Sequence, residues 1–288
     1  MEISNFYAQL KNDLIAWAKA REDIRVILQV GSRARKVKPG DDYADLDLSV
    51  VHAGKSSPGL IEDCLKWLKA YAPVWAALED RHDDSPAWLI LYRGGIKVDV
   101  DFSPVASLKK LIAEQALWDD QSRGYEVLLD KDGLGDQLPL PRYFEPTTFN
   151  PPSGEAFLSQ VEAFYYGAVF AAKQIKRNNL WRVKWADQYQ QRALLEMLEW
   201  HAHAASRGPV ETWSRGDFMQ DWVSGETWEA LHGVFGRFDA ADSRQALLAS
   251  VGLYTRLAQE TAENWGYPLP GELIAEVRMY LEDLLALV

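Results

Sequence analysis

The segment 24–48, IRVILQVGSRARKVKPGDDYADLDL, contains the patterns that decide the fold of this chain. Residues 24–30 are apolar, rich in β-branched side chains and end at Gly31, which predicts a buried strand. From residue 45 to residue 51, polar and apolar side chains alternate, as they do in a half-buried strand. The residues between the two strands are polar and basic, so they predict a loop over 32–43.

Asp45 and Asp47 alternate with leucines on the second predicted strand. Both carboxylates therefore project from one face, roughly 7 Å apart along the chain, while Leu46 and Leu48 point into a core. Two carboxylates on one face repel each other unless a counter-charge lies nearby. Magnesium binds carboxylates together with phosphate oxygens, and a pair of such ions activates a hydroxyl and stabilises a leaving pyrophosphate. We therefore expect Asp45 and Asp47 to be catalytic metal ligands.

A second acidic strand follows in the sequence. Residues 87–92 and 96–102 are strand-like, and the short turn between them contains two glycines, which predicts a hairpin. Asp99 and Asp101 share one face of its second strand. If that strand lies beside the first acidic strand, the carboxylates form one ledge, and one of them can accept the proton of an attacking hydroxyl. The alternative is an ordinary solvated face of the hairpin.

The residues after the first strand suit a phosphate group. Gly31 allows close approach of the backbone to a ligand, and free N–H groups with the Ser32 hydroxyl suit phosphate oxygens. Arg33 can pair with a triphosphate through two hydrogen bonds. Lys131, after a short predicted strand over 125–129, is a further phosphate ligand or a simple turn lysine. The P-loop and GxGxxG patterns are absent.

Composition changes in the middle of the chain. Residues 134–154 are rich in proline and predict a linker, beyond which the pattern is almost wholly helical. We therefore predict an α+β protein with a mixed-sheet domain over 1–138, a linker over 139–154 and an α-helical bundle over 155–288. The remaining elements expected are helices over 3–20, 60–72 and 108–118, a loop over 79–85, a helix from the N-cap Ser153 to about 178, and helices around 185–201, 227–238, 243–265 and 271–287.

Charge and composition narrow the class of protein. The chain of 288 residues has a net charge of −11, and both halves are acidic, which disfavours a nucleic-acid partner. The acidity suits a cationic substrate, although solubility alone also explains it. No apolar run is long enough to span a membrane and the N-terminus lacks the pattern of a signal peptide, so we expect a cytoplasmic protein. The single cysteine, Cys64, excludes an intramolecular disulfide and is expected to be a buried thiol.

The helical half offers groups for a cationic acceptor. It is rich in tryptophan, and Trp185 is a candidate for cation–π contact. Asp187, Glu196 and Glu199 are candidates to pair with ammonium or guanidinium groups. Burial in the core for the tryptophan, and a solvated helix face for the acids, are the alternatives.

These motifs resemble those of known enzymes. Gly31-Ser32, twelve intervening residues and Asp45-Leu46-Asp47-Leu48 look like the signature of the DNA polymerase β-like nucleotidyltransferase superfamily, and 97–101, KVDVD, resembles its third-carboxylate element. The segments VGSR (30–33), LLDKDG (128–133) and LLEMLEW (194–200) resemble the streptomycin (aminoglycoside 6-) adenylyltransferase family. This resemblance covers most of the chain.

The resemblance implies an activity and its participants. The family transfers AMP from ATP to a hydroxyl of an aminoglycoside, with Mg²⁺ and release of pyrophosphate, and so confers antibiotic resistance. By resemblance, Asp45 and Asp47 are metal ligands, and Asp99 is both the third metal-binding carboxylate and the base. The expected partners are ATP and a small cationic acceptor bound by a monomer, with no nucleic acid and no membrane. The residues expected at the acceptor are Asp101, Trp185, Asp187 and Glu196.

Other functions are compatible with the same motifs. A non-catalytic homologue would bind a nucleotide or a cationic ligand without turnover, and another enzyme would nucleotidylate a different acceptor, such as a protein or RNA. The presence of every acidic position argues against the first alternative. The helical half diverges from the family, so the sequence leaves the acceptor open.

Overall fold

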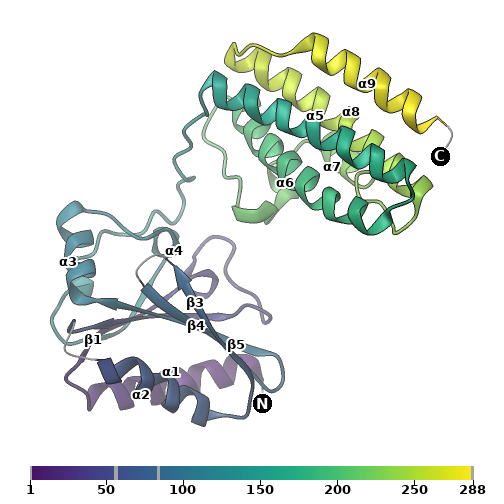
Figure 1. Ribbon diagram of the computed structural model, residues 1–288. Coiled ribbons are helices and arrows are strands. Elements are labelled where there is room, and N and C mark those ends of the chain that lie inside the picture. Colours follow the sequence, from purple (N-terminus) through teal and green to yellow (C-terminus); the bar gives the residue numbers. More distant parts are fainter. Residues whose placement is uncertain (1, 55–57, 83–84, 287–288) are drawn as a thin grey trace. The chain divides into compact units, whose positions relative to one another are not determined.

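The computed structural model describes residues 2–54, 58–82 and 85–286. The chain forms two compact units, Met1–Glu145 and Pro146–Val288 (Figure 1). The first contains a mixed sheet with helices, and the second is helical. No helix in the described ranges is long and apolar enough to cross a membrane. The predicted α+β class, a mixed sheet with helices followed by a helical bundle, is confirmed.

The first unit is built on a six-stranded sheet with the order β3-β4-β5-β2-β1-β6. The central pair β2–β5 is parallel, and the other neighbouring strands are antiparallel. This arrangement places the two acidic strands side by side at the centre of the sheet. The strands are β1 (Ile24–Val30), β2 (Leu46–His52), β3 (Val74–His82), β4 (Ser85–Tyr92), β5 (Ile96–Pro104) and β6 (Glu126–Asp130).

One face of the sheet is covered by α1 (Ile3–Lys19) and α2 (Pro58–Tyr71) (Figure 1). The leucines of β2 pack into the core on this side, where Leu14, Leu46 and Leu48 are almost completely buried. Burying these side chains removes apolar surface from water, which fixes the face that each strand turns to the core. The acidic residues of β2 and β5 are consequently placed on the opposite face.

The opposite face is partly covered by α3 (Val105–Glu114), while α4 (Asp119–Ser122) lies near the acidic residues. Leu28 and Val51 pack there in a smaller core with Leu108 of α3. The apolar side chains that pack against α3 therefore lie on one part of this face, and the carboxylates lie on the other, polar part.

The second unit begins with a well-capped helix. The Ser153 hydroxyl accepts a hydrogen bond from the Ala156 N–H at 3.1 Å, as the sequence predicts for an N-cap. In its core the Phe164 and Tyr254 rings stack with their centroids 3.6 Å apart. The helices are α5 (Gly154–Lys176), α6 (Leu180–Ala205), α7 (Gly225–Leu231), α8 (Ala240–Trp265) and α9 (Gly271–Leu285) (Figure 1).

Three local expectations are wrong. Residues 79–85, expected as a loop, continue the edge strand β3 into its hairpin with β4, with 83–84 outside the described residues. An edge strand tolerates charge because solvent reaches it, so charge alone does not indicate a loop there. The helix expected over 108–118 ends at Glu114, because Gln115 adopts a left-handed conformation with φ 50°. The helix expected over 227–238 ends at Leu231, and a short turn follows.

Candidate active site

The parallel pairing of β2 with β5 brings the predicted carboxylates together. Asp47 lies opposite Asp99 and Ser49 lies opposite Asp101 in the register of the two strands. The Ser49 hydroxyl donates to Asp101 Oδ1 at 2.9 Å. Asp45 directly precedes β2, and its carboxylate accepts a hydrogen bond from the Lys97 ammonium of β5. The sequence predicted a ledge of three or four carboxylates, and the structure places four aspartates on one face of the sheet.

Gly31 leaves the space that the Asp47 carboxylate fills. Its φ is +67°, and a Cβ atom on it would lie 2.1 Å from Asp47 Oδ2. Strand β1 places Val30 opposite Asp47, so Gly31 and Ser32 follow at the same end of the sheet. The Gly31 N–H donates to the Asp120 carbonyl at 3.4 Å, which connects this turn to α4. Glycine here serves the packing of a site residue as well as the turn.

The site concentrates negative charge in a partly buried place. Burial, together with the charges of Asp99, Asp45 and Asp120, raises the pKa of Asp47 to about 7. Burial also raises the pKa of Asp101 to about 7, against the hydrogen bond from Ser49. The pKa of Asp99 is raised chiefly by burial, with Lys97 opposing. A bound cation would offset the cost of keeping these partly buried carboxylates charged, and would reduce the repulsion between them.

The donor atoms fit a divalent cation shared with substrate. Asp99 Oδ1 is buried and has no hydrogen-bond partner among the described residues. Such an oxygen beside Asp47 is a hard ligand of the kind that Mg²⁺ prefers. No three His, Cys, Asp or Glu side chains of the described ranges are grouped to hold a metal ion by themselves. Magnesium commonly takes one or two protein carboxylates and completes its shell with water and phosphate oxygens, so the two observations agree.

Arg33 has a positioning role in the structure. Its Nε and Nη2 donate to the Ala44 carbonyl at 3.1 and 2.8 Å, and Nη2 also reaches the Asp41 carbonyl at 3.3 Å. Its guanidinium lies over the Tyr7 ring, 4.4 Å from the centroid. These contacts brace the loop that leads into Asp45. The pairing of Arg33 with a triphosphate stays a prediction.

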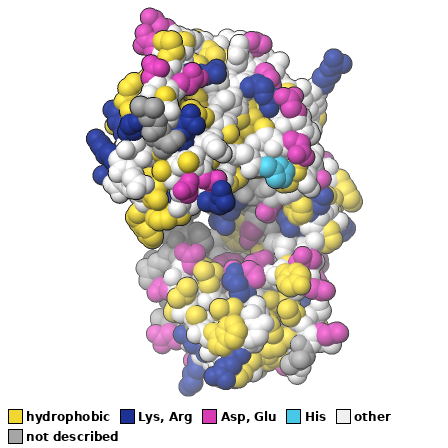
Figure 2. Space-filling view, turned by 90° about the vertical axis from the view of Figure 1, so that its right-hand side faces the viewer, with side chains coloured by type: hydrophobic (Ala, Val, Ile, Leu, Met, Phe, Trp, Pro, Cys, Tyr) yellow, Lys and Arg dark blue, Asp and Glu magenta, His cyan; other side chains and the backbone are white. Residues whose placement is uncertain are grey.

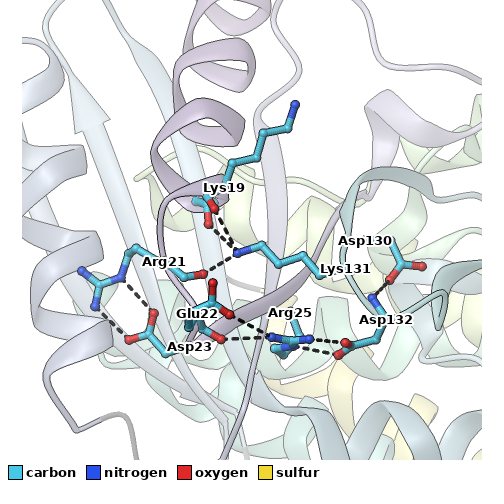
Figure 3. A network of polar contacts seen from close by, with 9 residues as sticks. Lys19, Arg21, Glu22, Asp23, Arg25, Asp130, Lys131 and Asp132 are labelled. Atoms are coloured by element: carbon cyan, nitrogen blue, oxygen red, sulfur yellow. Dashed lines mark hydrogen bonds and ion pairs between the residues drawn. The ribbon is translucent and has the colours of Figure 1, made fainter.

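Lys131 reaches toward the residues at the end of α1, beside Lys19 and Arg21 (Figure 3). Its ammonium donates to the Ala18 carbonyl at 2.9 Å and also to the Arg21 carbonyl, just after α1. Its backbone N–H bonds to the Arg25 carbonyl at the start of β1, whereas Gly31 follows the other end of that strand. The structure therefore does not bring Lys131 to the carboxylate ledge, and gives it the role of closing the C-terminal end of α1.

Two residues of the site were missed in the sequence. Lys97 lies two residues before Asp99, and strand alternation alone indicated that it shares the face of Asp99 and Asp101. Asp120 of α4 adds its charge to Asp47 and Asp101, and no local pattern indicates that it returns to the site. Its proximity follows only from the packing of α4 beside the Gly31 turn.

The predicted acceptor residues of the second unit lie on α6. Trp185 is half exposed and packs edge-on against Tyr189, with centroids 4.7 Å apart. Asp187 pairs with Lys184 at 2.9 Å. Burial raises the pKa of Glu199 to about 7, with Glu196 adding to the effect. These groups combine an exposed aromatic surface with partly buried acids, while Figure 2 shows acidic, basic and hydrophobic side chains interspersed over the displayed face.

With this geometry in place, comparison with known proteins assigns the family. The family model described as streptomycin adenylyltransferase matches residues 7–284. The chain belongs to the streptomycin adenylyltransferase family. Membership confirms the resemblance inferred from the sequence and the predicted enzyme class, an aminoglycoside nucleotidyltransferase.

Two curated relatives of this chain are distant from it in sequence. The chain is 21% identical to an aminoglycoside 6-adenylyltransferase of Bacillus subtilis (strain 168) over 258 residues, covering 86% of this chain and 87% of that protein. It is 22% identical to an aminoglycoside 6-adenylyltransferase of Campylobacter jejuni over 272 residues, covering 91% of each. A crystal structure of an aminoglycoside 6-adenyltransferase from Bacillus subtilis matches with a TM-score of 0.43 and 17% identity, covering 96% of both chains.

Proposed function

We propose that this enzyme transfers AMP from ATP to a hydroxyl of a streptomycin-like aminoglycoside and releases pyrophosphate. The observation that carries the proposal is the register that places Asp47 opposite Asp99, beside a glycine turn that leaves room for the Asp47 carboxylate. The names of both curated relatives, aminoglycoside 6-adenylyltransferases, support an adenylyl donor and an aminoglycoside acceptor.

In this proposal the carboxylates and the glycine turn have different roles in binding ATP. Asp47 and Asp99 would hold Mg²⁺ together with phosphate oxygens, and Asp45, which pairs with Lys97, directly precedes β2 at the same site. When bound, the metal neutralises charge on the transferring phosphate and the leaving pyrophosphate. The turn at Gly31 and the Ser32 hydroxyl supply hydrogen-bond donors for the phosphate oxygens.

Asp99 is the base in this proposal. The acceptor oxygen forms a bond to the α-phosphorus, the bond from that phosphorus to pyrophosphate breaks, and the hydroxyl proton passes to Asp99. Burial raises the pKa of Asp99, which makes its carboxylate a stronger proton acceptor than one in water.

The α6 residues are the proposed acceptor ligands. An aminoglycoside presents ammonium or guanidinium groups on sugar rings, which suit the half-exposed Trp185 through cation–π contact. Glu196 supplies a carboxylate on the same helix, and the raised pKa of its neighbour Glu199 indicates that a cation would be favoured there. Asp187 is already paired with Lys184, so it contributes less charge to an acceptor.

A direct assay tests the proposal. The purified chain is incubated with ATP, Mg²⁺ and a panel of aminoglycosides, and mass spectrometry detects the acceptor with one added AMP while pyrophosphate release is measured. We expect an adduct with streptomycin, and none with the Asp47→Asn variant, whose circular dichroism should match the wild type. Calorimetric binding of ATP and streptomycin without adduct or pyrophosphate would instead identify a non-catalytic, sequestering homologue.

A further inference from the structure

A lysine ammonium lies within the carboxylate ledge. Lys97 Nζ forms an ion pair and hydrogen bond with Asp45 Oδ2, and lies 3.8 Å from Asp99 Oδ2. One cation thus contacts a carboxylate of β5 and the carboxylate of the residue that precedes β2. A positive charge between like charges reduces their repulsion, which is also the effect of a bound metal ion.

The backbone of Lys97 is fixed while its side chain has a route to solvent. Its carbonyl accepts a hydrogen bond from the Tyr7 hydroxyl at 2.9 Å, and β5 holds it between neighbouring strand residues. The side chain is 40% exposed, compared with 34% for Asp45 and 28% for Asp99. A flexible lysine stem can therefore move its ammonium into water without disturbing the sheet.

The charge of the ledge explains why a cation is needed there. Asp47 lies opposite Asp99 across β2 and β5, with Asp45 and Asp101 on the same face, and Lys97 is a basic residue in contact with Asp45 and Asp99. The Lys97 ammonium pairs with Asp45 and lies near Asp99, so its contacts join two of these carboxylates. Asp99 Oδ1 nevertheless keeps no hydrogen-bond partner among the described residues, which leaves an oxygen for a second cation.

We propose that Lys97 is the resident counter-cation of the carboxylate ledge and is exchanged for the divalent cation when that ion binds. The inference rests on the proposed function for the presence of a metal, and assigns Lys97 a positioning role within it. In the metal-free protein the ammonium holds Asp45 and Asp99 in place. The ion and the ammonium compete for these carboxylates, so each weakens the binding of the other.

Substitution of Lys97 should affect metal binding differently from substitution of a lysine that only supports the fold. Removing the ammonium leaves the carboxylates without their counter-charge, so the metal-free protein should become less stable. The same change removes the competitor, so a divalent cation should bind more tightly. A lysine that merely supported the fold would lower stability with and without metal and would not tighten the metal site.

Mn²⁺ is the probe, because its free ion is counted by electron paramagnetic resonance without nucleotide or acceptor. At pH 8 we expect Lys97→Met to bind Mn²⁺ at least about tenfold more tightly than the wild type, because a like charge a few ångströms away is removed. Its Tm in EDTA should fall, and the rise of Tm on adding Mn²⁺ should exceed that of the wild type. Lys97→Arg, which retains the charge, should bind Mn²⁺ no more tightly than the wild type.

The matched control is Lys110→Met, which removes one positive charge from an exposed lysine paired with Glu114 on α3. It should leave Mn²⁺ affinity unchanged. An affinity of Lys97→Met equal to or weaker than that of the wild type, or a wild type that binds no Mn²⁺, would overturn the inference. Failure of AMP transfer alone would count against the proposed function and not against this competition.

A second measurement uses the wild type and so does not depend on the folding of a variant. Brief acetylation followed by peptide mass spectrometry reports the reactivity of each lysine. Mn²⁺ should raise the labelling of Lys97 several-fold, because the displaced side chain leaves its carboxylate partners and becomes more accessible to the reagent in solvent. Lys110 should be labelled equally with and without the ion. Unchanged labelling of Lys97 at saturating Mn²⁺ would contradict the exchange.

Discussion

At the scale of single residues, Asp99 and Asp101 differ in what surrounds their carboxylates. Asp99 has a buried Oδ1 without a partner among the described residues and lies opposite Asp47. Asp101 is more deeply buried and accepts a hydrogen bond from Ser49. A group that must bind a cation or a proton needs an available atom, so the structure favours Asp99 for chemistry and Asp101 for support of the site.

The two aspartates should therefore respond differently to removal of charge. Asp99→Asn should lower kcat by about 100-fold or more, since loss of a general acid or base typically costs roughly 10²–10⁴. Asp101→Asn should retain most of the activity, because an amide can still accept the Ser49 hydrogen bond. Steady-state kinetics of both variants, with circular dichroism to verify folding, checks the prediction. Equal losses in the two variants would contradict the distinction.

Gly31 is a second residue with a specific steric role. Gly31→Ala should place a methyl group onto Asp47 Oδ2 and impose a strained positive φ. The backbone strain costs about 1–3 kcal/mol of unfolding free energy, and displacement of Asp47 should abolish most AMP transfer. Urea unfolding and kinetics measure the two effects. Gly94→Ala is the control, because Gly94 also has a positive φ but open space around it, so that variant should lose stability and keep kcat.

At the scale of elements, the segment after β6 forms hydrogen bonds and an ion pair with the connection between α1 and β1. Lys131 donates to carbonyls at the end of α1, and Arg25 pairs with Asp132 across β1 and β6 (Figure 3). The last carbonyls of a helix have no partner within it, so a lysine that reaches them stabilises its end. This part of the LLDKDG motif therefore supports the fold at a distance from the carboxylates.

Lys131→Met should consequently affect stability more than catalysis. Loss of charged hydrogen bonds to the α1 carbonyls should lower the unfolding free energy by about 1–2 kcal/mol, less than a fully buried group would lose. The kcat and the KM for ATP should stay near those of the wild type. Lys19→Met removes an exposed charge from the same helix end and should change stability less. A large rise in KM for ATP at unchanged stability would support the phosphate role predicted from the sequence instead.

At the scale of the whole molecule, each unit contains a partly buried acid that binds its proton more tightly in the folded state. Burial raises the pKa of Asp47 in the first unit and of Glu199 in the second, each to about 7. For an acid of raised pKa the folded state holds the proton more tightly than the unfolded state. The associated stability is present at low pH and is lost as pH rises through the folded pKa.

Glu199→Gln tests this linkage away from the metal site. The wild-type unfolding free energy should fall as pH rises from about 4.5, the ordinary glutamate value, to about 7. The variant lacks this contribution, so its stability relative to the wild type should be greater at pH 8 than at pH 5. Urea unfolding across this range measures the difference, and parallel curves for the two proteins would contradict it. Glu282→Gln, which changes an exposed glutamate of α9, serves as the control for loss of one charge.

The sequence by itself determined the elements whose signal is local. Alternation in β2 and β5 assigned the carboxylates to one face, and the proline-rich stretch separated a mixed-sheet region from a helical one. The hydroxyl of Ser153 capped α5 as predicted. Such patterns are readable because strand and helix periodicity depends on neighbouring residues and on burial of one face.

Only the tertiary structure decided which distant residues meet. The parallel register of Asp47 with Asp99 joins strands that are far apart in sequence, and it follows from packing both strands into one core. The same packing brought Lys97 to Asp45 and kept Lys131 at the other end of β1. A local pattern carries no information about strand partners, because pairing is selected by the apolar surface buried across the entire sheet.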